Sequence, residues 1–99
     1  MNQMSGGQRS SFTSKQGQYL AFIDGYTRVH CRPPAEHEMQ RYFGVTPPSV
    51  HQMILTLERA GLIRRQPGVP RSIEVLVPPK DLPVLDANIQ PVKSSVPRY

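Results

Sequence analysis

The side chains that could bind a metal or act as a nucleophile cluster in one segment, with His30, Cys31, His37 and Glu38 close together. Imidazole and thiolate bind zinc, but this chain has no paired C-x2-4-C pattern, and adjacent residues of an extended segment point apart. No Asp or Asn is placed to orient a histidine for Cys31 as a nucleophile, and SGGQRS lacks the lysine and strand of a phosphate loop. We therefore expect no catalytic residue, metal, cofactor or small-molecule substrate.

The arginines of the second half indicate a different chemistry, the binding of phosphate groups. Four of them lie in or just before GLIRRQPGVPRSIEVL, where the only acid is Glu74: Arg59, Arg64, Arg65 and Arg71. A charged hairpin edge can also serve only to prevent aggregation. The formal net charge of +5 favours polyanionic partners. Because the basic residues concentrate in a hairpin and not along one face of a helix, we favour nucleic acid over a membrane surface.

Length and composition set the domain organisation. The chain of 99 residues suffices for one domain. We divide it into a flexible polar arm (1–11), a folded domain (12–78) and a proline-rich extended tail (79–99). It has no apolar run of about eighteen residues and no apolar core of a secretion signal, so we expect a cytoplasmic protein.

Apolar spacing predicts two helices in the first half of the domain. In FTSKQGQYLAFIDGYTRV, Thr13 and Gln16 form a capping-box pattern at the start of an amphipathic helix of about fifteen residues. Gly17 and Gly25 should each weaken this helix by about 1 kcal/mol. HCRPP then predicts a short extended connection, because residues before proline disfavour the helical state. A second helix should begin at Pro34, stop at Gly44 and turn three residues inward: Met39, Tyr42 and Phe43.

The segment VTPPSVHQMILTLERAG predicts a third helix over 47–60, with Thr46 as N-cap and Gly61 after its end. One narrow arc of this helix should face the core, namely Val50, Ile54 and Leu57. The opposite side carries Pro48, Gln52, Leu55 and Arg59.

Two β-prone runs after Gly61, LIRR and RSIEVLV, predict a hairpin over 62–77 in which Ile73, Val75 and Val77 alternate with polar or exposed positions. The order of elements therefore predicts an α+β fold, a winged helix-turn-helix of three helices plus a C-terminal β-hairpin wing. In such domains the third helix fits the major groove of DNA, and the wing reaches the backbone or minor groove.

Four segments, KQGQYLAFI, PPAEHEM, GVTPPSVHQMILTLERAGLIRR and PRSIEVL, resemble the DNA-binding domain of LexA-type SOS repressors over residues 12–77. The resemblance implies a bacterial transcriptional repressor that reads operator DNA with groove-facing residues of its third helix, Pro48, Ser49, His51 and Gln52. That family continues into a self-cleaving peptidase domain with a Ser-Lys dyad, which we do not expect here. The family also dimerises largely through that domain, so a homodimer of this chain would have to use the hairpin edge, the first helix or the tail.

We assign roles to the candidate site residues accordingly. Pro48, Ser49 and Gln52 are expected to read sequence, and His51 to contact a base or phosphate or to cap the solvent side of the core. Thr46 and Arg59 are expected to anchor phosphates, Thr46 at the positive N-terminus of the third helix. Arg64, Arg65 and Arg71 are assigned to the wing.

Two alternatives to double-stranded DNA remain. The first is a winged-helix module that docks a protein partner through Leu55 and the apolar LPVLDANI segment. The second is RNA, which the sequence favours less because it lacks the clustered exposed aromatic residues that single-strand stacking requires.

Overall fold

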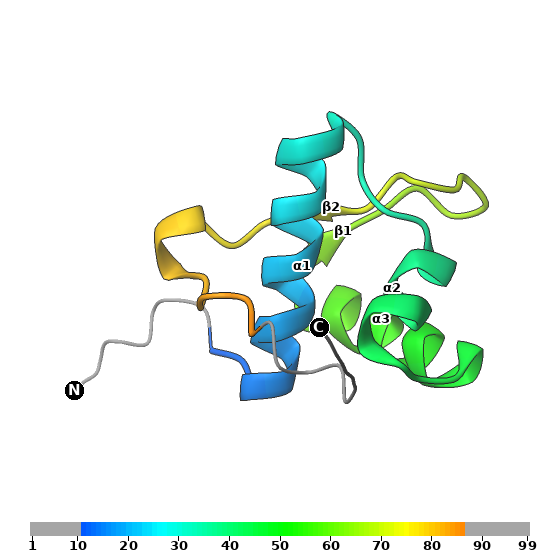
Figure 1. The fold of residues 1–99 in the computed structure, drawn as a ribbon, viewed down its shortest axis with the longest axis horizontal. Coiled ribbons are helices and arrows are strands. Elements are labelled where there is room, and N and C mark those ends of the chain that lie inside the picture. Colours follow the sequence, from blue (N-terminus) through cyan, green and yellow to red (C-terminus); the bar gives the residue numbers. More distant parts are fainter. Residues whose placement is uncertain (1–10, 87–99) are drawn as a thin grey trace, which may run out of the picture.

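The computed structural model describes residues 11–86, whose elements follow the order predicted from the sequence (Figure 1). The helices are α1 (Ser14–His30), α2 (Glu36–Phe43) and α3 (Pro47–Arg59). The strands are β1 (Ile63–Arg64) and β2 (Glu74–Val75), and the 3-10 helix η2 (Pro79–Asp81) comes after them. Most of the expected polar arm (1–10) and of the expected tail (87–99) lies outside the described residues.

Helix α1 begins at the predicted capping box. The Gln16 N–H donates to Thr13 Oγ1 at 3.1 Å, and the Thr13 N–H donates to Gln16 Oε1 at 2.9 Å. The expectation that the helix ends before His30 is wrong, since α1 includes His30 and closes at Cys31 in the left-handed conformation, with φ 61°. The proline rule disfavours the helical state only for a residue directly before a proline, here Arg32 and Pro33, and it does not reach back to His30, which continues the helix.

Helix α2 begins at Glu36 and not at Pro34, because the Glu38 carboxylate accepts the main-chain N–H of Ala35 at 2.7 Å and so caps the first turn. The helix stops at Gly44, whose φ of 65° confirms the predicted left-handed stop. Met39 is fully buried, as expected, whereas Tyr42 is only partly buried at the edge of the core.

Helix α3 follows after a tight turn, begins at Pro47 as predicted and ends at Arg59, one residue before the predicted end. Thr46 is the N-cap, with its hydroxyl oxygen accepting the Ser49 N–H at 3.3 Å, and Pro47 occupies the first helical position. Gly61 has a φ of 78°, which a residue with a side chain rarely adopts. The predicted core arc is also confirmed, since Val50, Ile54 and Leu57 have no exposed surface.

The hairpin pairs β1 with β2 in antiparallel register, with Ile63 opposite Val75. Its strands are shorter than the sequence predicts because the Ser72 side chain replaces strand pairing nearer the tip. The main-chain N–H of Gln66 donates to Ser72 Oγ at 3.0 Å, and the Ser72 hydroxyl donates to the Val69 carbonyl at 2.8 Å. The wing (62–77) is therefore a short ladder with a tip held by a side chain.

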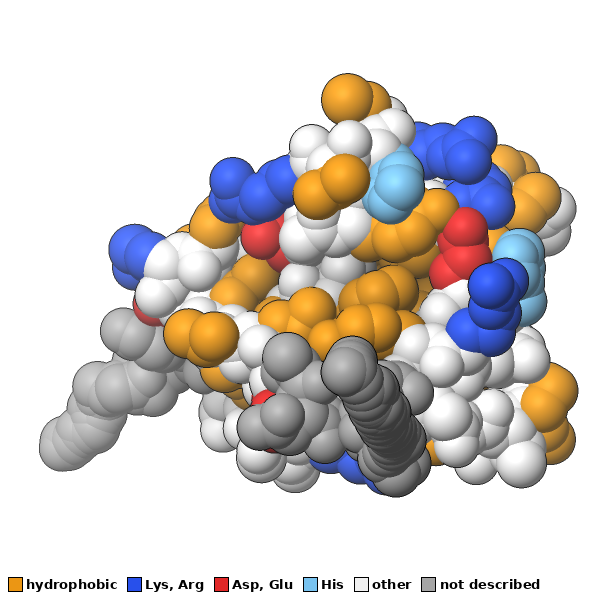
Figure 2. Space-filling view, viewed as in Figure 1, with side chains coloured by type: hydrophobic (Ala, Val, Ile, Leu, Met, Phe, Trp, Pro, Cys, Tyr) orange, Lys and Arg blue, Asp and Glu red, His pale blue; other side chains and the backbone are white. Residues whose placement is uncertain are grey.

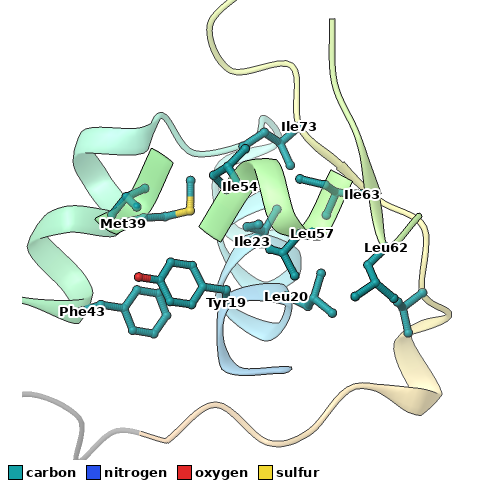
Figure 3. Close-up of a cluster of buried hydrophobic side chains, with 12 residues drawn as sticks. Tyr19, Leu20, Ile23, Met39, Phe43, Ile54, Leu57, Leu62, Ile63 and Ile73 are labelled. Carbon is teal, nitrogen blue, oxygen red and sulfur yellow. The ribbon is translucent and has the colours of Figure 1, made fainter. Parts of the chain in front are cut away.

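One hydrophobic core joins the three helices to the base of the wing (Figure 3). The rings of Tyr19 and Phe43 stack with centroids 4.1 Å apart, and Met39 lies near Ile54. The buried members are Tyr19, Leu20, Ile23, Met39, Phe43, Val50, Ile54, Leu57, Leu62, Ile63, Ile73 and Val77. Because β1 contains Ile63 and β2 directly follows Ile73, both members of this cluster, the base of the wing is fixed by burial.

Residues 78–86 return along α1 on the side away from the wing (Figure 1). Leu82 packs on the core, and the Gln18 side chain donates to the Val84 carbonyl at 3.0 Å and accepts the Asp86 N–H at 2.6 Å. This docked segment (78–86) thus belongs to the folded unit. Among residues 11–86, no helix is long and apolar enough to cross a membrane.

Candidate nucleic-acid interface

The outer face of α3 near its N-terminus presents Pro48, Ser49 and Gln52 to solvent. Within residues 11–86 the Gln52 side-chain amide has no hydrogen-bond partner, so both its donor and its acceptor atoms are available to a ligand. The Ser49 hydroxyl accepts a hydrogen bond from the Thr46 hydroxyl at 3.0 Å and still has a proton to donate. Leu55 is only half-buried and lies further along the helix.

A shallow groove of about 540 Å³ runs between this face and the start of α1. The side of α1 contributes Thr13, Lys15 and Gln16, and α3 contributes Pro48, Ser49, Gln52, Met53 and Thr56. Lys15 is exposed and makes no ion pair with any residue of the described chain, so its ammonium group can bind an anion at the edge of the groove. The sequence analysis missed Lys15, because only the tertiary fold brings α1 beside α3.

The N-terminus of α3 is a weaker anion site than the sequence suggests. Pro47 and Pro48 occupy its first two positions and have no N–H group. The N–H of Ser49 is already bonded to the Thr46 hydroxyl. The helix dipole therefore still favours an anion here, but within the described chain the first turn of α3 offers no free main-chain N–H to bind one.

His51 lies on the side of α3 that faces the first turn of α2. Its Nδ1 atom is 3.4 Å from Glu36 Oε1, and half of the side chain is exposed. The ring is therefore positioned by α2 and reaches solvent at its other edge. This placement is compatible with the base or phosphate contact assigned to it.

The arginines of α3 and the wing differ in what they contact. Arg59 is exposed at the end of α3, with no ion pair inside residues 11–86. Arg64 pairs with the exposed Glu74 across the hairpin. Arg65 is more constrained, since its Nε donates to the Glu58 carboxylate at 3.0 Å and its side chain is only 21% exposed.

Arg71 is held most tightly of the four. Its Nη1 donates to Glu38 Oε1 at 2.8 Å and its Nη2 to Glu38 Oε2 at 3.3 Å. The same Nη1 lies 3.4 Å from the Pro33 carbonyl oxygen and from the Tyr26 hydroxyl, which itself donates to Glu38 Oε2 at 2.6 Å. Arg71 therefore joins the wing to α1, α2 and the connection between them.

This network perturbs both charged groups. Partial burial acts to raise the pKa of Glu38, but hydrogen bonds from the Tyr26 hydroxyl, the Ala35 N–H and Arg71 outweigh it and lower the pKa to about 2. Hydrogen bonds with Tyr26 and Glu38 raise the pKa of Arg71 above its ordinary value. Both partners therefore carry full charge at neutral pH.

The face of the molecule seen in Figure 2 carries hydrophobic side chains in its centre and Lys and Arg side chains mainly at its edge. Between α1 and α2, the ring of Phe22 stacks on that of Tyr42 with centroids 4.6 Å apart. Tyr26 lies against His30 one helical turn away, at 4.1 Å. His30 is thus occupied by an aromatic contact, and no three His, Cys, Asp or Glu side chains of the described part of the chain come together as metal ligands.

Three helices around one core, an exposed face on the third helix and an arginine-bearing hairpin directly after it define a winged helix-turn-helix domain. The family model for the LexA DNA binding domain matches residues 9–72. The chain therefore belongs to the LexA DNA-binding domain family.

Similar proteins agree with this assignment. The LexA repressor of Thermotoga neapolitana is 35% identical over 63 residues, which cover 64% of this chain and 32% of the relative. The LexA repressor of Shouchella clausii is 37% identical over 68 residues, or 68% of this chain and 33% of the relative. That of Thermosipho africanus is 30% identical over 84 residues, or 85% of this chain and 39% of the relative. The match thus spans about a third of the length of these relatives.

Proposed function

We propose that this chain binds double-stranded DNA in a sequence-specific manner and acts as a repressor-like regulator of transcription in a bacterium. The observation that carries the proposal is the outer face of α3, where Pro48, Ser49 and Gln52 are exposed at the helix end that such folds insert into the major groove. Membership of the LexA DNA-binding domain family supports the same function.

The three exposed residues suit base edges in different ways. The Gln52 amide can pair with the N6 and N7 atoms of adenine, and the Ser49 hydroxyl can donate to an acceptor in the groove. The Pro48 ring offers an apolar surface that can contact the methyl group of thymine. His51, held beside Glu36, is proposed to contact a base or phosphate at the rim of the same surface.

Phosphate contacts are proposed to come from side chains more than from the helix N-terminus. Lys15 lies at the edge of the groove, Arg59 is exposed at the end of α3, and Arg64 and Arg65 lie in the wing. Thr46 is proposed to favour a phosphate through the helix dipole, while its hydroxyl caps α3. Arg71 remains a candidate for the wing contact, although its guanidinium is engaged by Glu38.

The proposal assigns no catalytic step to the described residues: the protein would act by occupying DNA in the cytoplasm. Binding as a homodimer would extend the proposal: two copies related by a two-fold axis would read an inverted repeat on one duplex.

The docking of residues 82–86 on α1 supports DNA over the alternative of a protein-docking module, since this segment does not cover the outer face of α3.

Selection of bound duplexes from a random pool, repeated at two salt concentrations, tests the proposal. We expect one enriched sequence motif, and an affinity that falls steeply as salt rises. An inverted repeat in the motif would support the dimer, and a single half-site would support a monomer. Binding without enrichment, or binding that does not depend on salt, would contradict the proposal.

A further inference from the structure

Arg71 combines an unfavourable backbone conformation with four contacts across the fold. Its φ of 56° lies in the left-handed region, which residues with a long side chain rarely adopt. Such a conformation persists only where the surrounding structure enforces it, and it often marks a functional constraint. Here the constraint is visible, since the guanidinium contacts Glu38, Tyr26 and the Pro33 carbonyl.

These contacts join segments that are far apart in the sequence, separated by 33 residues for Arg71 and Glu38 and by 45 for Arg71 and Tyr26. In Figure 1 the connection between α1 and α2 passes beside the wing. A hollow of about 400 Å³ lies between them, lined by Pro34 of the connection and His37 of the first turn of α2 on one side and by Val69 and Arg71 of the wing on the other. The strand pairing itself extends only over Ile63–Arg64 and Glu74–Val75, below the tip.

We propose that Arg71 is a positioning residue: together with Glu38 and Tyr26 it forms a latch that fixes the outer part of the wing against the helix-turn-helix, and so sets where the wing meets DNA. This inference rests on the proposed function. The short ladder alone would leave residues 66–72 free to tilt, whereas the latch ties the strand that leaves the tip to α2, the helix directly before α3. The planar guanidinium suits this role because it bonds both carboxylate oxygens at once.

Glu38→Gln and Glu74→Gln form a matched pair of variants for the test. Each neutralises a carboxylate that pairs with an arginine of the wing, but only Glu38 belongs to the latch. For the duplex selected by the wild type, we expect Glu74→Gln to bind at least as tightly as the wild type. We expect Glu38→Gln to bind about tenfold more weakly, with a smaller salt slope and an unchanged preferred sequence, because wing phosphate contacts are lost while α3 still reads the bases.

Arg71→Lys separates positioning from direct phosphate binding. Lysine keeps the positive charge and can still bind a phosphate, but it cannot bond both oxygens of Glu38 in a fixed plane. If Arg71 acts through the latch, Arg71→Lys should lose as much DNA affinity as Glu38→Gln. If Arg71 instead binds a DNA phosphate directly, Arg71→Lys should retain most of the wild-type affinity. Wild-type affinity and salt slope in both Glu38→Gln and Arg71→Lys would overturn the inference.

Amide hydrogen exchange gives a second measurement that requires no DNA and also checks that the variants fold. In Glu38→Gln we expect faster exchange at Val69 in the tip, with unchanged protection at Ile54 and Leu57 in α3. Unchanged exchange in the tip would overturn the latch. If the wild type selects no duplex, the proposed function fails, and this exchange experiment alone decides whether the latch holds the wing.

Discussion

Gly17 of α1 faces Pro83 so closely that a Cβ atom on Gly17 would lie 3.0 Å from Pro83 Cγ. The same Cβ would lie 2.9 Å from Cε1 of Phe12. Gly17 is therefore the position where α1 admits the docked segment (78–86). The sequence alone suggested only that this glycine weakens the helix.

Two glycine substitutions in α1 should consequently have opposite effects. Gly17→Ala should lower the free energy of unfolding by about 1 kcal/mol, because Phe12 and Pro83 must move to admit the methyl group. Gly25→Ala should raise it by about 0.5–1 kcal/mol, since nothing lies within 4 Å of its Cβ position. Urea unfolding followed by circular dichroism measures both, and equal effects of the two substitutions would contradict the packing role of Gly17.

The N-cap of α3 should contribute measurably to stability. Thr46→Ala removes the acceptor of the Ser49 N–H, which is the first main-chain donor of α3 because Pro47 and Pro48 have no N–H. We expect a loss of about 1 kcal/mol in unfolding free energy. Thr46→Ser retains the acceptor and serves as the control, so an equal loss in both variants would refute the capping role.

The latch should also shape the dependence of stability on acid. The pKa of Glu38 is about 2 in the folded protein and 4.5 for an ordinary glutamate, so the folded state holds this proton less tightly than the unfolded state. Its contribution is therefore fully present above about pH 4.5 and is lost as the pH falls towards 2.

The Glu38→Gln variant isolates this contribution. Its unfolding free energy should be lower than that of the wild type at pH 6, and the difference should shrink as the pH falls from 4.5 to 2. Arg71 stays charged over this range, because its hydrogen bonds with Tyr26 and Glu38 raise its pKa, so the change with pH is assigned to Glu38. Thermal unfolding at a series of pH values measures the effect, and a constant difference would show that the carboxylate is not held in its charged form.

Substitutions of Gln52 and Lys15 should affect different properties of DNA binding: Gln52 the base preference and Lys15 the salt dependence. Gln52→Ala should relax the preference at one base position by about 1–3 kcal/mol while leaving the salt slope unchanged. Lys15→Gln should keep the preferred sequence and reduce the salt slope by about 0.9, the value for one phosphate. Competition binding with single-base variants of the selected duplex, at several salt concentrations, distinguishes the two. A changed base preference in Lys15→Gln would count against its assignment as a phosphate contact.

The helices and their core faces could be predicted because their signals are local. The Thr13–Gln16 box, the Thr46 cap and the left-handed Gly44 each lie within four residues of the helix end that they define. Val50, Ile54 and Leu57 follow the period of the helix, and a period requires no knowledge of the partner surface.

The remaining features depend on contacts between distant segments, which no local pattern reveals. The sequence assigned Arg71 to the wing, but it could not reveal the carboxylate 33 residues earlier that engages this arginine. Lys15 joins the candidate interface only because α1 packs beside α3. The strands are shorter than predicted because the Ser72 hydroxyl forms hydrogen bonds with the main chain of Gln66 and Val69 in the turn. The alternation of apolar residues does not indicate such side-chain bonds.

The docking of residues 78–86 changes the geometry of anything attached further along the chain. As far as Asp86 the chain stays on the domain, where Asp86 contacts Gln18 and Tyr42, and it does not leave the domain at the end of the wing at Val77. These nine docked residues would add up to about 30 Å of reach if they were extended and free. A second domain fused directly after Asp86 would therefore be attached beside α1, and its attachment point would lie outside the groove between α1 and α3.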